Sequence, residues 1–121
     1  MKSLAFILLF LIPVSASAAD GAKLFTPCRA CHSLDPADQG LPGPNLSGLI
    51  GRKVGGDAAF DYSPVLRKAN GEGLRWDTER LQRFLADPAD MFPGLWMSIR
   101  GVEDEADRTA LVRFLSDPAS R

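Results

Sequence analysis

The sequence predicts a small all-α fold in which three to five short helices are joined by long loops. Apolar residues recur at helical spacing in two stretches near the carboxyl end, 81–85 and 106–115. The chain's 11 glycines and 9 prolines interrupt much of the rest, which leaves room only for short elements. Without the leader described next, roughly 100 residues remain, enough for one domain in which an apolar core alone is marginal.

The amino terminus has the pattern of a cleaved secretory signal over residues 1–19. Lys2 precedes an apolar run over 4–12, and the small residues that follow include the cleavage pattern Ala16-Ser17-Ala18. A membrane anchor is the alternative, but a run of about ten residues is shorter than the roughly 20 that cross a bilayer as a helix. We therefore expect residues 20–121 to form an exported domain that does not span the membrane.

The first element of that domain is a predicted helix over 21–30. Asp20 is a suitable N-cap for it, and Pro27 is expected to bend or break it. The stretch 40–56 is rich in glycine and proline and shows no sustained period, so it predicts an irregular loop. A loop of that length in a small domain usually has a function or wraps around something.

A second, brief helix is predicted over 63–68. Ser63 is a fair N-cap, and Pro64 suits the first helical position. The Asn70-Gly71 pair then predicts a turn in the chain.

A clearer helix should begin with Asp77 or Thr78 as its cap and stop at Asp87-Pro88. The stretch 89–101 that follows contains proline and glycine and is expected to be irregular. It nevertheless contains five large apolar residues, which must cover or contact something: Met91, Phe92, Trp96, Met97 and Ile99.

The last helix is predicted to begin near Glu103 and to end by Asp117-Pro118. One of its faces is an apolar stripe, formed by Ala106, Ala110, Leu111, Phe114 and Leu115. If the two terminal helices cross, Leu111 and Phe114 would meet three residues of the first helix: Gly21, Leu24 and Phe25.

The motif with the clearest chemistry is Cys28-Arg29-Ala30-Cys31-His32. It contains both cysteines and the only histidine of the chain. Two thiols three positions apart in one helical turn can each form a thioether to a haem vinyl group, and the next imidazole can then bind the iron. The motif therefore indicates one covalently bound haem c, attached through Cys28 and Cys31, with His32 as an axial ligand.

Three other interpretations of these residues are possible. A redox dithiol usually follows a strand in a βαβ unit, and nothing before Cys28 resembles a buried strand. A structural zinc site needs four ligands, and the chain has no further Cys or His. A disulfide between residues three apart would close a small loop and stabilise little. Nucleic-acid binding is excluded separately, because the formal net charge is −1.

A second axial ligand cannot be a histidine, because His32 is the only one. Once the leader is removed, the remaining thioethers are those of Met91 and Met97. Either methionine could equally be a gap filler in the core, so the residues themselves leave the choice open.

From Gly21 to Leu115 the chain resembles the class I c-type cytochromes. The resemblance rests on the haem motif and on an ordered series of further residues: Gly43-Pro44-Asn45-Leu46, Gly51-Arg52-Lys53-x-Gly55, Phe60-x-Tyr62-Ser63, Trp76, Asp87-Pro88, Pro93-Gly94-x-x-Met97, Leu111, Phe114 and Leu115. It implies a small cytochrome c fold wrapped around one haem. It also implies that Met97 is the sixth ligand and that the Pro44 carbonyl accepts a hydrogen bond from His32. Three residues would contact the haem propionates: Arg52, Tyr62 and Trp76.

The implied function is that of a soluble mono-haem electron carrier that cycles between Fe(III) and Fe(II) and is not an enzyme. We expect a monomer in the periplasm, where bacteria attach haem covalently, that exchanges electrons with redox proteins of the membrane or periplasm. Three positions that carry lysines in mitochondrial cytochrome c have other residues here: Ala89, Asp90 and Trp96. The expected contact with partners is therefore a mainly apolar patch with two arginines at its rim, formed by Phe92, Trp96, Ile99, Arg29 and Arg100.

Two other functions remain possible. The chain could be the haem subunit of a periplasmic dehydrogenase or sulfur-oxidising complex, with the apolar loop buried in a permanent interface. It could also be a haem peroxidase or gas sensor with a labile methionine, although no second histidine is available for peroxide chemistry.

Overall fold

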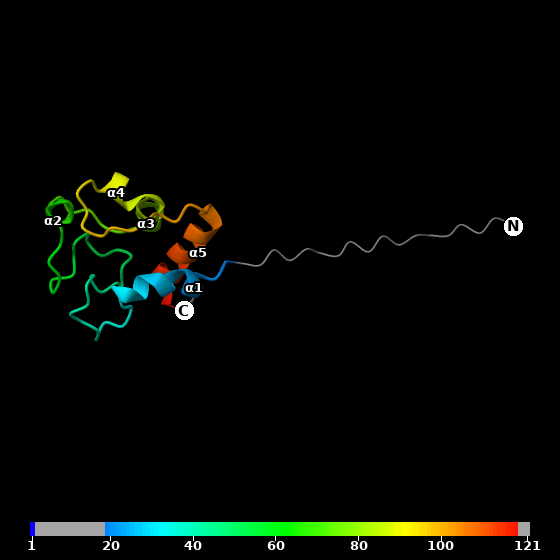
Figure 1. Ribbon diagram of the computed structural model, residues 1–121, viewed down its shortest axis with the longest axis horizontal. Helices are drawn as coiled ribbons and strands as arrows, with labels where there is room; N and C mark the ends of the chain where they lie inside the picture. Colours follow the sequence, from blue (N-terminus) through cyan, green and yellow to red (C-terminus); the bar gives the residue numbers. More distant parts are fainter. Residues whose placement is uncertain (2–18, 119–121) are drawn as a thin grey trace.

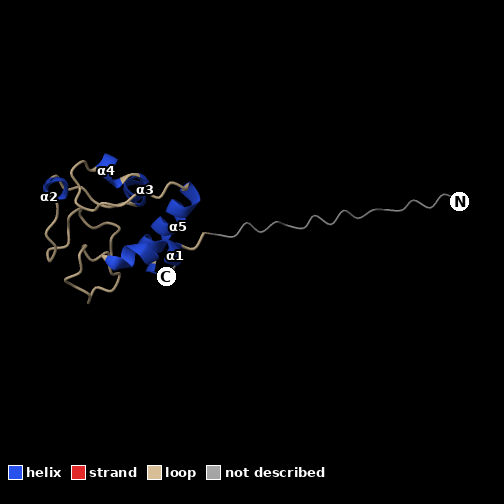
Figure 2. Cartoon of the chain, viewed as in Figure 1, coloured by secondary structure: helices blue, strands red, loops and turns tan. Residues whose placement is uncertain are grey.

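A computed structural model describes Met1 and residues 19–118, so the predicted signal over 1–19 lies almost entirely outside the described residues. The described chain contains five α-helices and one 3₁₀ helix: α1 (Gly21–Phe25), η1 (Thr26–Ala30), α2 (Pro64–Gly71), α3 (Thr78–Ala86), α4 (Pro88–Met91) and α5 (Glu105–Ser116). Long loops join them, and no strand occurs in residues 19–118 (Figure 2). The predicted all-α class is confirmed. Within the same range, no helix is long and apolar enough to cross a membrane.

The first helix begins at the residue that the sequence predicts, and it passes into a 3₁₀ helix near the predicted break at Pro27. Asp20 caps α1, because its Oδ1 accepts hydrogen bonds from the amides of Ala22 at 3.0 Å and Lys23 at 3.4 Å. The α-helix ends at Phe25, and the chain continues through Pro27 as η1. The proline, which donates no amide hydrogen bond, therefore lies at the start of the tighter helix.

The two terminal helices of the described chain lie against each other, as predicted (Figure 1). A Cβ on Gly21 would lie 2.6 Å from both the Ala110 carbonyl oxygen and the Phe114 Cβ, so only glycine permits this approach. The rings of Phe25 and Phe114 pack beside that crossing, with centroids 5.5 Å apart. Both rings belong to the buried core, so the crossing of α1 and α5 forms part of it.

Ser63 is the N-cap of α2 and Pro64 is its first residue, as predicted. The Ser63 hydroxyl makes no capping bond, however, and is buried without a partner in the described chain. The predicted turn at Asn70-Gly71 comes slightly later, because both residues still belong to α2 and the Gly73 amide donates to the Asn70 carbonyl at 2.9 Å. The Asn70 side chain donates to the carbonyls of Val54 at 3.0 Å and Gly55 at 3.2 Å. The helix continues through Gly71, and the chain turns at Gly73, whose φ is 75°.

The stretch 89–101 is more regular than predicted. Its first residues belong to α4, a single turn that follows α3 directly. Pro88 occupies the first turn, and the Asp87 side chain accepts from the Asp90 amide at 3.1 Å. The two residues expected to stop α3 therefore also start the next helix.

The last helix starts slightly later than expected, at Glu105, because Asp104 is its N-cap and accepts from the Asp107 amide at 2.9 Å. The buried core joins α1, α3 and α5 to the loops before α2 and α3. Its largest members are Phe25, Leu49, Trp76, Leu81, Leu85, Phe92, Leu111, Phe114 and Leu115.

Candidate functional site

The three residues of the Cys-x-x-Cys-His motif lie where a helix becomes a loop. Cys28 is half-buried within η1, and Cys31 is exposed directly after it. The carbonyl of Cys28 accepts from the amides of Cys31 at 3.1 Å and His32 at 2.9 Å, which keeps the motif within one compact turn. No disulfide joins Cys28 to Cys31, so the structure does not support the disulfide interpretation. A zinc site also lacks support, since no cluster of three or more metal-binding side chains occurs among the described residues.

One hydrogen bond fixes the imidazole of His32. Its Nδ1 lies 2.7 Å from the carbonyl oxygen of Pro44. Because a carbonyl can only accept, Nδ1 carries the proton, and Nε2 retains the lone pair that a metal needs. Burial lowers the pKa of His32, and the Pro44 carbonyl partly opposes that shift. The environment therefore favours the neutral ring, which is the form that binds iron.

Gly43 allows Pro44 to approach the histidine. Its amide donates to the Cys31 carbonyl at 2.9 Å, and a Cβ at this position would lie 2.7 Å from His32 Cε1. Any side chain here would displace the ring or the loop. The Gly43-Pro44 pair therefore brings the carbonyl to the imidazole.

Asn45 holds the same loop from its other side. Its buried amide nitrogen Nδ2 donates to the carbonyls of Asp35 at 2.6 Å and Asp38 at 3.0 Å. Its Oδ1 accepts from the amide and the hydroxyl of Ser47. All the hydrogen-bonding groups of this buried side chain have partners, which makes the loop rigid.

The structure brings Arg52 and Trp76 together through their main chains. The amide of Trp76 donates to the Arg52 carbonyl at 2.9 Å, and that of Gly51 donates to the Trp76 carbonyl at 2.7 Å. Trp76 is buried. Arg52 Nη1 donates to the Ser47 carbonyl at 3.2 Å, but its buried Nε has no partner in the described chain. A buried, unused guanidinium donor fits an anionic group such as a haem carboxylate.

Tyr62 lies in the same region. It is buried, and its hydroxyl oxygen accepts from the Asp57 amide at 3.0 Å. Burial raises the pKa of the Tyr62 phenol, while the Asp57 amide and the positive charge of Arg52 oppose the shift. The phenol therefore keeps its own proton and can still donate a hydrogen bond.

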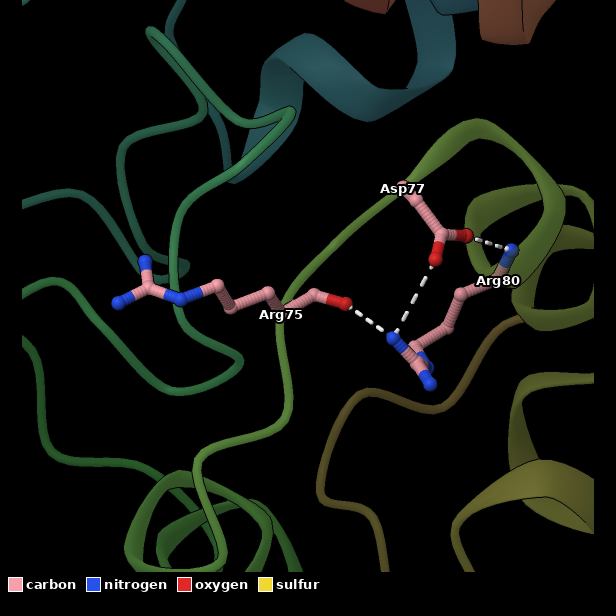
Figure 3. Close-up of polar contacts among 3 residues, drawn as sticks. All are labelled: Arg75, Asp77 and Arg80. Carbon is pink, nitrogen blue, oxygen red and sulfur yellow. Dashed lines mark hydrogen bonds and ion pairs between the residues drawn. The ribbon is translucent and has the colours of Figure 1, made fainter.

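A polar clamp that the sequence did not reveal holds the segment before Trp76 (Figure 3). Arg80 lies in the first turn of α3 and donates to the Arg75 carbonyl. It also pairs with the Asp77 carboxylate at 3.5 Å, and its amide is capped by Asp77 at 2.6 Å. Arg75 in turn donates from Nη1 to the Gly51 carbonyl at 2.8 Å. The sequence indicates only the Asp77 cap, because the other partners are main-chain carbonyls.

The two methionines differ in their surroundings. Met91 ends α4 and packs against the buried core, which is the role of a gap filler. Met97 is half-buried in the irregular loop after α4. Just beyond it, the Val102 amide donates to the Leu85 carbonyl at 2.8 Å and fixes that loop to α3.

No protein-family model matches the chain. The similar proteins that comparison finds include several cytochromes of the c type. The chain is 37% identical over 102 residues to cytochrome c2 of Agrobacterium tumefaciens (strain II Chrys), which covers 84% of this chain and 92% of the relative. It is 37% identical over 97 residues to cytochrome c-550 of Ancylobacter novellus, covering 80% and 91% of the two chains. Among solved structures it is similar to cytochrome cH from Methylobacterium extorquens, with a TM-score of 0.71 and 36% identity over 83% of this chain and 97% of that one.

Proposed function

Because the chain belongs to the class I c-type cytochromes, mono-haem electron carriers, we propose that His32 and Met97 are its two axial iron ligands and that Cys28 and Cys31 hold the haem covalently. The hydrogen bond of 2.7 Å between His32 Nδ1 and the Pro44 oxygen carries this proposal, because it presents Nε2 as a ligand. When bound, the haem supplies a one-electron Fe(III)/Fe(II) couple whose potential is raised by Met/His ligation.

The chain's own residues would tune that couple. Pro44 sets the orientation and basicity of the His32 ring through its carbonyl. We assign Arg52, Tyr62 and Trp76 to the haem carboxylates. The unused Nε of Arg52 and the retained phenol proton of Tyr62 are the two donors that support this assignment.

If His32 and Met97 both bind the iron, no position on the metal would remain for a substrate. We therefore propose that the protein is not an enzyme and acts by exchanging electrons with other redox proteins. The proposed compartment is the periplasm. The chain would be exported there by the signal over residues 1–19, which would then be cleaved. This is consistent with the leader pattern and with bacterial relatives such as cytochrome c2 of Agrobacterium tumefaciens.

Substitution of Met97 tests the ligand assignment. The ferric protein should show the weak near-infrared band of a sulfur-to-iron bond, and Met97→Ala should abolish it. Met91→Leu is the matched control, because Met91 packs against the core, and that variant should retain the band. Retention in Met97→Ala with loss in Met91→Leu would reverse the assignment.

The proposed contact with redox partners needs one correction. Phe92 is only 7% exposed and belongs to the core, so it cannot form the expected docking patch. Trp96 is 60% exposed and Ile99 is 47% exposed, and both lie beside Met97 in the loop. We assign partner contact to these two side chains, with Arg29 and Arg100 at the rim.

An apolar contact of this kind predicts a weak dependence on salt, because screening acts on charges. Electron exchange with a membrane or periplasmic redox protein from the native host should slow less than about tenfold between low and physiological ionic strength. Trp96→Ala should slow the exchange without changing the near-infrared band. A steep decrease with salt would instead assign the encounter to charge.

We propose that the protein is a monomer and that it is a free carrier, not a subunit of a larger complex. Size-exclusion chromatography of an extract from the native host tests these two proposals. Elution at the size of one chain supports both of them. Co-elution with a dehydrogenase or a sulfur-oxidising complex would identify a permanent subunit.

A further inference from the structure

Asp57 joins the loop that follows His32 to the segment that leads to Tyr62. Its Oδ2 accepts a hydrogen bond from the Asn45 amide at 3.0 Å, and its own amide donates to the Tyr62 hydroxyl at 3.0 Å. Its Oδ1 accepts from the Ala59 amide at 3.0 Å. Both carboxylate oxygens are therefore held by main-chain donors, so the side chain has a fixed direction.

The contact with Asn45 matters because of the peptide bond it belongs to. The Asn45 amide and the Pro44 carbonyl are the two ends of one peptide unit, and that unit is planar. Holding the N–H end in place therefore fixes the direction of the C=O end. The C=O end is the group that lies 2.7 Å from His32 Nδ1.

The same contact also affects the strength of the histidine's hydrogen bond. A carboxylate that accepts from an amide N–H polarises the peptide unit and increases the negative charge on its oxygen. The Pro44 oxygen then becomes a stronger acceptor for the imidazole. A stronger acceptor at Nδ1 raises the basicity of the opposite ring nitrogen.

We propose that Asp57 is a positioning residue for His32, acting through the Pro44–Asn45 peptide unit. The inference rests on the proposed function only in that His32 is the iron ligand. It assigns a role to a loop carboxylate that accepts from the N–H end of that peptide unit, while the ring bonds to the C=O end.

Hydrogen exchange of the His32 Nδ1 proton, measured by NMR in the ferrous holoprotein, tests this proposal. Asp57→Ala should accelerate that exchange roughly tenfold or more, because the Asn45 amide loses its acceptor and the Pro44 carbonyl loses its fixed direction. Asp57→Asn should give a smaller acceleration, since one carboxamide oxygen can replace only one of the two acceptors. Both variants should raise the reduction potential, because a less basic histidine stabilises the ferric iron less.

Asp61→Asn is the matched control. It removes the same charge four residues away, from an exposed carboxylate that pairs with Arg67 at 2.8 Å. This control should leave the exchange of the ring proton unchanged and should change the potential less than Asp57→Asn does. The comparison separates the positioning effect from the loss of a charge.

Wild-type protein provides a test that needs no variant. A scalar coupling across the hydrogen bond between the Asn45 amide nitrogen and the Asp57 carboxylate carbon should be detectable, and its absence overturns the proposal. So does an unchanged exchange rate of the ring proton in a folded Asp57 variant. If the wild-type spectrum instead shows no His32 ring protons shifted by the haem, the ligand assignment fails, which distinguishes the two failures.

Discussion

At the scale of single residues, the surroundings of His32 are decided by main-chain groups as much as by side chains. The Cys28-x-x-Cys31-His32 spacing identifies the site because covalent haem attachment requires those residue types in that order. Asp57 could not be found in the same way. A loop aspartate has no pattern of its own, and its contact with the Asn45 amide depends on how two parts of the long loop before α2 fold together.

Tyr62 gives a prediction at this scale that a single signal can check. Burial raises the pKa of its phenol above the ordinary value of about 10. The unfolded chain therefore loses this proton first as the pH rises. The free energy of unfolding should accordingly decrease as the pH rises above about 10.

The chain contains one tyrosine, so labelling the ring carbon of tyrosine with ¹³C gives one resonance to follow by NMR in the folded protein. The pH midpoint of the change in this resonance should lie above the midpoint for a model tyrosine peptide. A midpoint at or below the peptide value would contradict the burial of this phenol.

At the scale of elements, local signals predicted most of the helix boundaries. Asp20 and Asp77 cap α1 and α3 as predicted, and α3 and α5 end directly before Asp87-Pro88 and Asp117-Pro118. Ser63 lies at the N-cap of α2 but makes no side-chain bond there. The helix extends three residues beyond its predicted end at residue 68, and the Asn70 side chain in that extension bonds to a distant loop. Local turn preferences do not report such tertiary contacts.

Gly101 determines how closely the loop after Met97 approaches α3. A methyl group on this residue would overlap the Ala86 carbonyl at the end of that helix. Gly101→Ala should therefore push the loop outwards and weaken the proposed bond between Met97 and the iron. We expect the near-infrared band to disappear with rising pH, and the pH midpoint of this loss should be roughly one to two units lower in Gly101→Ala than in the wild type, because the substitution overpacks the loop.

Gly71→Ala is the control for that substitution, because nothing lies within 4 Å of a Cβ there. It should leave the pH midpoint of the band unchanged. Equal midpoints for Gly101→Ala and the wild type would show that the loop tolerates the methyl group and that this contact does not hold Met97.

At the scale of the whole molecule, the class of fold and the crossing of α1 with α5 could be predicted because both depend on apolar spacing and on one glycine, Gly21. The arrangement of the loops could not. The meeting of Arg52 with Trp76, and the clamp of Arg75 and Arg80, use main-chain carbonyls that any sequence possesses. These loops nevertheless hold most of the proposed haem contacts.

The account as a whole requires an iron whose two axial positions are both filled by side chains of this chain. Exposure of the ferrous protein to carbon monoxide at neutral pH measures this directly. We predict no rapid binding to the wild type, because the proposed ligands His32 and Met97 would leave no vacancy, and rapid binding to Met97→Ala. Rapid binding to the wild type would contradict the account and would favour a gas sensor or a peroxidase.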